Sequence, residues 1–307
     1  MTPVSAGSLV QGTRGGTRIG PAVRTRTSDF LQLTKPRLNA LAVATALGGY
    51  YMAGGGGREF SLLFHTIVGT ALVAGGSAAF NQYYERVTDG LMRRTQVRPL
   101  PDGRMQAGDA LWFAIVLSAA GLLQLGLGAN LLAAAVALVT LVAYVAVYTP
   151  LKRRSPFSTV VGAIPGALPP IIGWTAVRGS LEPVSWVLFA IGFLWQLPHF
   201  LAIAWLYRAD YERAGFPMLP VIEPDGRSTG RQAVAYAAAL LPVSLAPAAF
   251  DLAGPVYFGA AFVLSAGFLG LSVWFAATRS TAAARWLFFG SIVYLPILWA
   301  FMLANKA

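Results

Sequence analysis

The chain has 307 residues, of which 56% are hydrophobic and only 11% are charged, and its formal net charge is +11. Soluble domains have a charged fraction of about a quarter, so this composition excludes an ordinary soluble globular protein. Cysteine is absent from the chain, which excludes disulfides, thiolate catalysis and cysteine-bound metals.

Apolar residues fall into blocks of about twenty, the length at which a helix crosses a bilayer. These blocks predict nine membrane spans, at residues 38–53, 61–80, 109–127, 130–149, 159–178, 184–206, 232–251, 254–277 and 286–304. The predicted fold class is therefore an all-α integral membrane protein.

The placement of the basic residues decides between a nucleic-acid partner and a role in membrane orientation. When the segments between the spans are assigned alternately to the two sides, all but three of the 23 Lys and Arg residues fall on one side. By the positive-inside tendency, the N-terminus is cytoplasmic and the C-terminus lies outside. We therefore expect the positive charge to orient the protein in the lipid bilayer, and we expect no nucleic-acid partner.

The first 29 residues are rich in Gly, Thr and Arg and lack a long apolar run, which argues against a secretory signal. We predict a flexible cytoplasmic tail over residues 1–29 and a membrane-embedded domain over residues 30–307. A transit peptide for an organelle is the alternative interpretation of the tail. The expected location is accordingly a bacterial inner membrane, with the mitochondrial inner membrane as the alternative.

Acidic residues are scarce, and eight of the twelve lie in or directly beside two long cytoplasmic connections, residues 81–108 and 207–231. The eight are Glu85, Asp89, Asp102, Asp109, Asp210, Glu212, Glu223 and Asp225. Long connections between spans more often have a function than not, so these two are the first place to look for a site.

The first connection begins with three oxygen-bearing side chains, Asn81, Glu85 and Asp89. If the second span continues as a helix, their spacing of four places them on one ridge about 12 Å long. This length suits two cations bridged by a diphosphate, and oxygen ligands favour Mg²⁺. The alternative is that Glu85 and Asp89 only pair with nearby arginines at a solvated helix end.

Basic residues that follow the ridge predict a phosphate-binding role. Arg94 and Arg98 come directly after it, and Lys152 and Arg153 follow the fourth span. Arginine forks bind phosphate oxygens in bidentate fashion. The alternative for each is the ordinary positive charge that flanks membrane spans.

The second connection carries Asp210, which we expect to face the first ridge across a cavity. Glu212 points away from Asp210 on a helix and is a weaker candidate.

Pro165, Pro169 and Pro170 break the fifth span, and an irregular helix at membrane depth is typical of a cavity wall.

One polar cluster interrupts the apolar body of the sixth span, at Trp195 to Phe200. It contains His199, and polar groups at this depth favour a functional role, with a purely structural hydrogen-bonding role as the alternative. The other histidine, His65, is interpreted as structural.

Six blocks of sequence occur together and in order. They are Leu33-Thr34-Lys35-Pro36-Arg37; Asn81 through Pro101; Tyr148-Thr149 with Leu151-Lys152-Arg153; Gly166-Ala167 with Pro169-Pro170 and Gly173-Trp174; Trp195-Gln196 with Pro198-His199-Phe200; and Asp210-Tyr211 with Ala214-Gly215 and Pro217-Met218-Leu219-Pro220. In these blocks the chain resembles the haem O synthases (protohaem IX farnesyltransferases), a branch of the UbiA-type membrane prenyltransferase superfamily. The acidic motif alone occurs across the superfamily, but the quinone and chlorophyll branches do not share the other five.

This resemblance implies a nine-helix bundle around a central cavity. It implies transfer of the farnesyl group of farnesyl diphosphate to a vinyl group of haem B, with water addition and Mg²⁺ assistance, to give haem O and diphosphate. It also points to proteins of the terminal-oxidase haem pathway as partners.

The resemblance assigns roles to nine residues. Asn81, Glu85 and Asp89 match the first metal–diphosphate motif and Asp210 belongs to the second; Arg94, Arg98, Lys152 and Arg153 match diphosphate-binding positions, and His199 matches a haem-associated histidine. Three departures stand out. Glu85 replaces the more usual Asp, and Ser158 stands where Asn is common. Ala209 and Ala214 stand where carboxylates are common, so the second metal site is predicted to be the poorer one. For the prenyl cation, Tyr84, Tyr148 and Trp174 are candidate aromatic stabilisers.

Two other functions fit parts of the sequence. A prenyltransferase acting on a quinone precursor would share the acidic ridge but lack the blocks Met92–Pro101 and Trp195–Phe200. A secondary transporter would explain a broken span and a cavity, but it is disfavoured because the acidic residues lie at one face and not at the membrane midplane.

Overall fold

The structure is a computed structural model that describes residues 25–55 and 59–307. Secondary structure in this part of the chain is helical, apart from one isolated bridge between Ala253 and Lys306. The elements are α1 (Arg26–Leu33), α2 (Pro36–Met52), α3 (Phe60–Leu91), α4 (Ala107–Gly128), α5 (Leu131–Val142), η1 (Ala143–Tyr148), α6 (Thr149–Leu151), α7 (Ser158–Ala167), α8 (Pro169–Arg178), α9 (Pro183–Leu206), α10 (Arg208–Arg213), α11 (Leu219–Ile222), α12 (Arg227–Ala249), α13 (Pro255–Thr278) and α14 (Thr281–Ala304).

Each predicted span corresponds to one helix or to one run of consecutive helices. Within the described residues, eight such segments are long and apolar enough to cross a membrane. The ninth, α2, has 17 residues, which is the lower limit for a spanning helix. The predicted all-helical membrane fold is confirmed, and α3 does continue through the ridge to Leu91.

The beginning of the folded part differs from the predicted boundary at residue 30. Residues 1–24 of the predicted tail lie outside the described residues, but α1 already begins at Arg26, capped by Thr25. Asp29 is buried and paired with Arg104 of the connection between α3 and α4. This buried ion pair attaches α1 to the bundle, so residues 26–29 belong to the domain.

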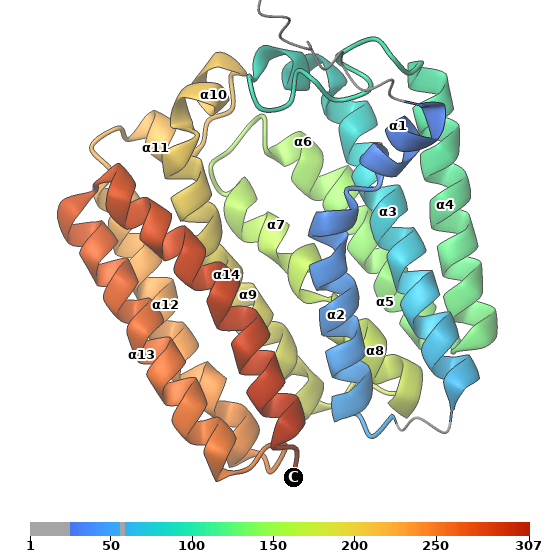
Figure 1. Ribbon diagram of the computed structural model, residues 1–307, viewed down its shortest axis with the longest axis vertical. Helices are drawn as coiled ribbons and strands as arrows, with labels where there is room; N and C mark the ends of the chain where they lie inside the picture. Colours follow the sequence, from blue (N-terminus) through green and yellow to red (C-terminus); the bar gives the residue numbers. More distant parts are fainter. Residues whose placement is uncertain (1–24, 56–58) are drawn as a thin grey trace, which may run out of the picture.

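The helices form two groups with the cavity-lining segments between them (Figure 1). One group contains α9 with α12, α13 and α14, which share a large apolar core; the other contains α3, α4, α5 and α8. The helix α2 lies against α8, and a Cβ at Gly173 of α8 would overlap the carbonyl oxygen of Ala46. Small residues of this kind allow membrane helices to approach closely.

Two irregular helices face the space between the groups. The fifth span is broken at Leu168, where α7 ends and α8 begins with Pro169 and Pro170, as the prolines predicted. The fourth span changes from α5 into the π-helical η1, whose wider turn lets the N–H of Thr149 bond the carbonyl of Tyr144. Single π-turns often mark functional sites.

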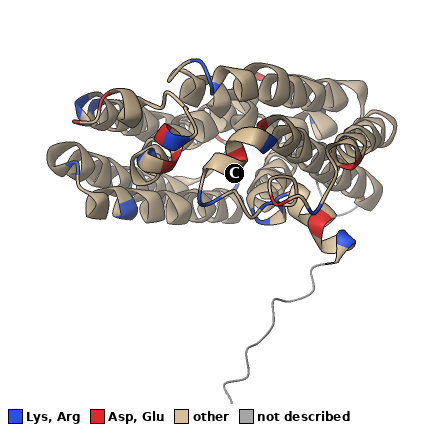
Figure 2. Ribbon diagram, turned by 90° about the horizontal axis from the view of Figure 1, so that it is seen from above, with Lys and Arg blue, Asp and Glu red and all other residues tan. Residues whose placement is uncertain are grey.

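Charged residues lie mostly in the connections and near helix ends. Figure 2 colours them in a view from above, where most of the ribbon is tan. The helix bodies carry few of them because unpaired charge inside a bilayer is costly.

Candidate active site

The predicted ridge exists on α3, and it is buried. Asn81 and Glu85 are each 3% exposed and Asp89 is fully buried. The carboxylates are paired with basic residues, as the alternative interpretation expected, but they do not lie at a solvated helix end. Their burial excludes a surface ion-pair array, and the role of the ridge in metal binding stays a prediction.

Only one of the two carboxylate oxygens of Asp89 has a hydrogen-bond partner among the described residues. Its Oδ2 accepts a hydrogen bond of 2.6 Å from Arg98, while its Oδ1 is buried without a hydrogen-bond partner among the described residues. The Thr95 hydroxyl donates to the backbone oxygen of Asp89 and stabilises the turn that follows α3. A buried carboxylate oxygen without a donor is a favourable position for a cation, so the residues present fit the Mg²⁺ that the ridge predicted.

Glu85 forms an ion pair with Lys152, with an Nζ to Oε1 distance of 3.2 Å. Burial by itself would lower the pKa of Lys152, but the Glu85 carboxylate raises it, so this lysine stays charged. The Lys152 ammonium also lies 4.8 Å from the centre of the Phe216 ring. Lys152 therefore connects α3 to the segment that follows α10.

Lys35 is a site residue to which sequence reasoning assigned no role. Its Nζ donates to Asn81 Oδ1 at 2.9 Å, and burial lowers the pKa of its ammonium to about 7. Its backbone is left-handed, at φ 46°. Gln82 holds this turn by donating to the backbone oxygens of Gln32 and Leu33. The only available signal was its position in the block Leu33–Arg37.

The two acidic connections lie together, as expected. Met92, after α3, shares an apolar cluster with Tyr211 and Phe216 from the second connection. The Arg94 guanidinium lies over the Tyr207 ring, 4.9 Å from its centre. These contacts bring the end of α10 next to the end of α3.

Asp210 itself is not part of the buried cluster. It is partly exposed and paired with Arg213 of its own helix. Within the described residues, no group of three or more His, Asp and Glu side chains is placed to hold a metal ion. The structure thus assembles the Asn81, Glu85 and Asp89 part of the site, and the role of Asp210 in metal binding stays a prediction.

Two of the predicted diphosphate residues are exposed. Arg94 and Arg153 both lie at the surface near the ridge, in contrast to Arg98 and Lys152, whose side chains are 25% and 12% exposed. Arg98 and Lys152 are therefore fixed by ion pairs, whereas Arg94 and Arg153 keep the freedom to move toward an anion.

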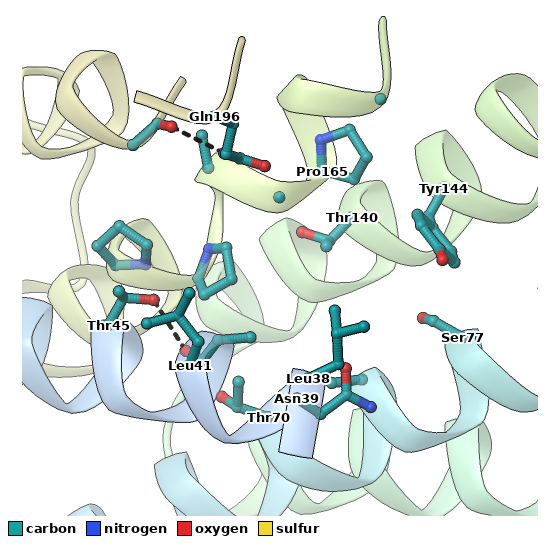
Figure 3. A pocket seen from close by; sticks show the side chains of 18 of the residues that line it. Leu38, Asn39, Leu41, Thr45, Thr70, Ser77, Thr140, Tyr144, Pro165 and Gln196 are labelled. Carbon is teal, nitrogen blue, oxygen red and sulfur yellow. Dashed lines mark hydrogen bonds between the residues drawn. The ribbon is translucent and has the colours of Figure 1, made fainter. Parts of the chain in front are cut away.

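A cavity of about 320 Å³ begins at Lys35 and extends between the two helix groups. Its walls come from α2, α3, the α5–η1 segment, α7, α8, α9 and α14, and they are mainly apolar. Figure 3 shows part of this lining, with Ser77 on α3 and with Thr140 and Tyr144 on the continuous α5–η1 segment. Among the described residues that line the cavity there is no carboxylate.

The three aromatic residues considered as stabilisers of the prenyl cation lie in different environments. Tyr148 lines the cavity beside Tyr144, and their ring centres are 5.4 Å apart. Tyr84 is 45% exposed, and Trp174 is buried in the core of the α9–α14 group without lining the cavity. The π-helical η1 carries both cavity tyrosines, so it is η1 that places aromatic faces near the ridge.

His199 lines the cavity from α9. Its Nδ1 lies 2.6 Å from the Ser291 hydroxyl, and its ring is stacked between Trp195 and Phe288. The structure therefore shows the hydrogen-bonding role, and because His199 also borders the cavity, its functional role stays a prediction. His65 is outside this cavity, toward the opposite end of α3.

These features define an integral membrane protein with a buried, mixed-charge site at one end of an apolar cavity. Residues 42–304 match the model of the UbiA prenyltransferase family. A protein of Solibacter usitatus named protoheme IX farnesyltransferase is 48% identical over 91% of this chain and 98% of its own length. A protein of Myxococcus xanthus with the same name is 45% identical over 91% and 95%.

Solved structures share the fold at low identity. A digeranylgeranylglyceryl phosphate synthase superposes with a TM-score of 0.76 at 15% identity, covering 91% of this chain and 98% of that one. A UbiA homologue from Archaeoglobus fulgidus, bound to DMAPP and Mg²⁺, has a TM-score of 0.65 at 15% identity, covering 90% and 98%. The chain belongs to the UbiA prenyltransferase family.

Proposed function

We propose that this protein transfers the farnesyl group of farnesyl diphosphate to a vinyl group of haem B and adds water, giving haem O and diphosphate. The relatives at 41–48% identity carry the name of this activity. The observation that carries the proposal is a set of three buried or half-buried cations, bonded to the ridge next to an apolar cavity that Lys35 lines. The pairs are Lys35 with Asn81, Arg98 with Asp89, and Lys152 with Glu85.

In this proposal Mg²⁺ would be held by Asn81, Glu85, Asp89 and Asp210. When bound, the metal would neutralise part of the diphosphate charge. Arg98 and Lys152 are released from their carboxylates toward the phosphate oxygens, and Lys35 donates to the same group. Arg94 and Arg153 bind its outer oxygens. Each donor stabilises negative charge that grows as the allylic carbon–oxygen bond breaks.

The cavity receives the farnesyl chain because its walls are mainly apolar. Tyr148 and Tyr144 border the cavity in the part of the fourth span that reaches the ridge, where their ring faces stabilise the developing cation. Exclusion of water from this end protects the cation until the haem vinyl group attacks. The protein is expected in the bacterial inner membrane with its N-terminus and diphosphate site on the cytoplasmic side, and terminal-oxidase haem proteins are its proposed partners.

The test uses membranes that contain the protein, incubated with haem B, farnesyl diphosphate and Mg²⁺, and product masses are measured. We expect haem carrying a hydroxyethylfarnesyl group, and we expect chelation of the metal to abolish it. A parallel incubation with 4-hydroxybenzoate replaces haem by a quinone precursor. Prenylation of 4-hydroxybenzoate in preference to haem would establish the quinone-type alternative, and consumption of neither acceptor by folded protein would refute both assignments of the acceptor.

A further inference from the structure

The hydrogen bonds around His199 determine which of its ring nitrogens carries the proton. The Ser291 hydroxyl donates its single hydrogen to the backbone oxygen of Phe288. The same hydroxyl oxygen lies 2.6 Å from His199 Nδ1, so in this contact the imidazole must be the donor. Nδ1 therefore carries the hydrogen, and Nε2 keeps a free lone pair.

The ring is also fixed in orientation. Trp195 and Phe288 stack on it with centre distances of 5.3 and 5.2 Å and interplanar angles of 20° and 26°. The Trp195 indole donates to the backbone oxygen of Ser291 at 2.8 Å, which ties α9 to α14 at this level. Nε2 makes no hydrogen bond to any described residue, and its side chain borders the cavity.

Among the described residues that line the cavity, few side chains are able to accept a proton. No carboxylate is present, and Tyr144 and Tyr148 are phenols, which are protonated near neutral pH. Lys35 lies at the mouth, where it donates to Asn81 and where the proposed diphosphate keeps it charged. His199 Nε2 is the remaining basic lone pair on the cavity wall.

We propose that His199 is the general base that activates the water added in the last step. This inference rests on the proposed function, because only a vinyl acceptor requires a hydration step. After the allylic carbon–oxygen bond has broken with its electron pair on the diphosphate, the vinyl π electrons form the new carbon–carbon bond. A cation then remains on the carbon next to the porphyrin.

In the hydration step, a water oxygen lone pair forms a bond to this carbon, and one water O–H bond breaks. Its proton goes to Nε2 of His199. The resulting imidazolium is stabilised because Nδ1–H donates to Ser291, and because the faces of Trp195 and Phe288 cover the positive ring. When no base activates the water, the cation instead loses a proton from the neighbouring carbon to a water molecule. The C–H electron pair re-forms the vinyl double bond, and the product is an unhydrated 1,4-diene that is lighter than the normal product by one water.

The experiment measures the ratio of diene to hydroxylated product by mass in purified protein with haem B, farnesyl diphosphate and Mg²⁺. His199→Gln keeps a polar side chain but lacks a basic nitrogen. We expect it to raise the diene fraction of the prenylated haem at least tenfold. Ser291→Ala removes the acceptor for Nδ1–H and should raise the diene fraction by a smaller amount. Ser272→Ala removes a buried hydroxyl that bonds only its own helix, and it should leave the ratio unchanged.

Haem affinity, followed by the Soret band, separates this role from iron ligation. A wild-type product ratio in His199→Gln would overturn the proposal, and so would a large loss of haem affinity or a Soret shift in that variant. If His199→Gln does not fold, an unchanged ratio in Ser291→Ala overturns it equally. Absence of any prenylated haem with the wild type is a different result, since it refutes the proposed function itself.

Discussion

The Lys35 ammonium lies 2.9 Å from the Oδ1 of Asn81, across 46 positions of sequence. The Asn81 amide in turn donates to the Thr149 hydroxyl, so the turn before α2, the ridge of α3 and the start of α6 meet at this amide. Within the described structure, Lys35 has no carboxylate within ion-pair distance, in contrast to Arg98 and Lys152. The Lys35 ammonium is bonded to a neutral amide oxygen and not to a carboxylate. Of the three cations at the ridge, it is therefore the most available to an incoming anion.

Replacing Lys35 by Met should weaken diphosphate binding. A hydrogen bond from a charged donor contributes about 1.5–3 kcal/mol, which corresponds to an increase of roughly 10- to 100-fold in KM for farnesyl diphosphate. The measurement is steady-state kinetics at saturating haem. Lys306→Met serves as the control, because Lys306 is exposed and donates to the Tyr51 carbonyl, and an equal loss in both variants would contradict a specific role for Lys35.

The low pKa of Lys35 predicts proton uptake on binding. Burial lowers this pKa to about 7, so the amine is mostly neutral in the unliganded protein at about pH 8 and mostly charged at about pH 6. An anion beside it favours the charged form, so diphosphate binding should take up close to one additional proton at the higher pH and much less at the lower pH. Calorimetry in two buffers of different ionisation enthalpy measures this number, with Lys35→Met as the reference. Equal proton uptake by both proteins at about pH 8 would argue against the shifted pKa.

Asp89→Asn should abolish turnover but leave the protein inserted. The substitution removes the charge that the proposed metal needs and keeps the size of the side chain. Arg98→Ala should behave differently, because it leaves a buried carboxylate without its partner, at a cost of about 3 kcal/mol in stability.

The two variants are compared by thermal unfolding in detergent and by product formation. Arg98→Ala is expected to unfold at a clearly lower temperature than Asp89→Asn. Asp102→Asn provides the matched control, since this carboxylate is about half exposed and paired with Arg104. Full activity of Asp89→Asn would remove the ridge from the mechanism.

Gly173→Ala should prevent the close packing of α2 against α8. A Cβ at Gly173 would overlap the Ala46 carbonyl oxygen, whereas one at Gly267 of α13 would meet no atom within 4 Å. We therefore expect Gly173→Ala to lower the unfolding temperature strongly and Gly267→Ala to have little effect. A similar unfolding temperature for the two variants would show that the α2–α8 contact can relax.

Sequence reasoning found the elements that depend on local physics. A bilayer requires about twenty apolar residues per helix, so the apolar blocks located every span of the bundle, including the break at Leu168 that the prolines impose. The spacing of four placed Asn81, Glu85 and Asp89 on one ridge because a helix repeats at nearly that period.

What only the tertiary structure decided is which side chains from distant segments meet. Ser291 lies 92 residues from His199, and Lys35 reaches Asn81 through a left-handed turn held by Gln82, so no local pattern points to either contact. Tertiary packing also distinguished two aspartates: the Asp89 side chain is 1% exposed and pairs with Arg98, nine residues along the chain, whereas the Asp210 side chain is 13% exposed and pairs with Arg213 of its own helix. The sequence determined the helices and the ridge, because both follow from hydropathy and helical period. The packing of helices far apart in the chain determined which charges pair, and it also fixed the tautomer of His199 that faces the cavity.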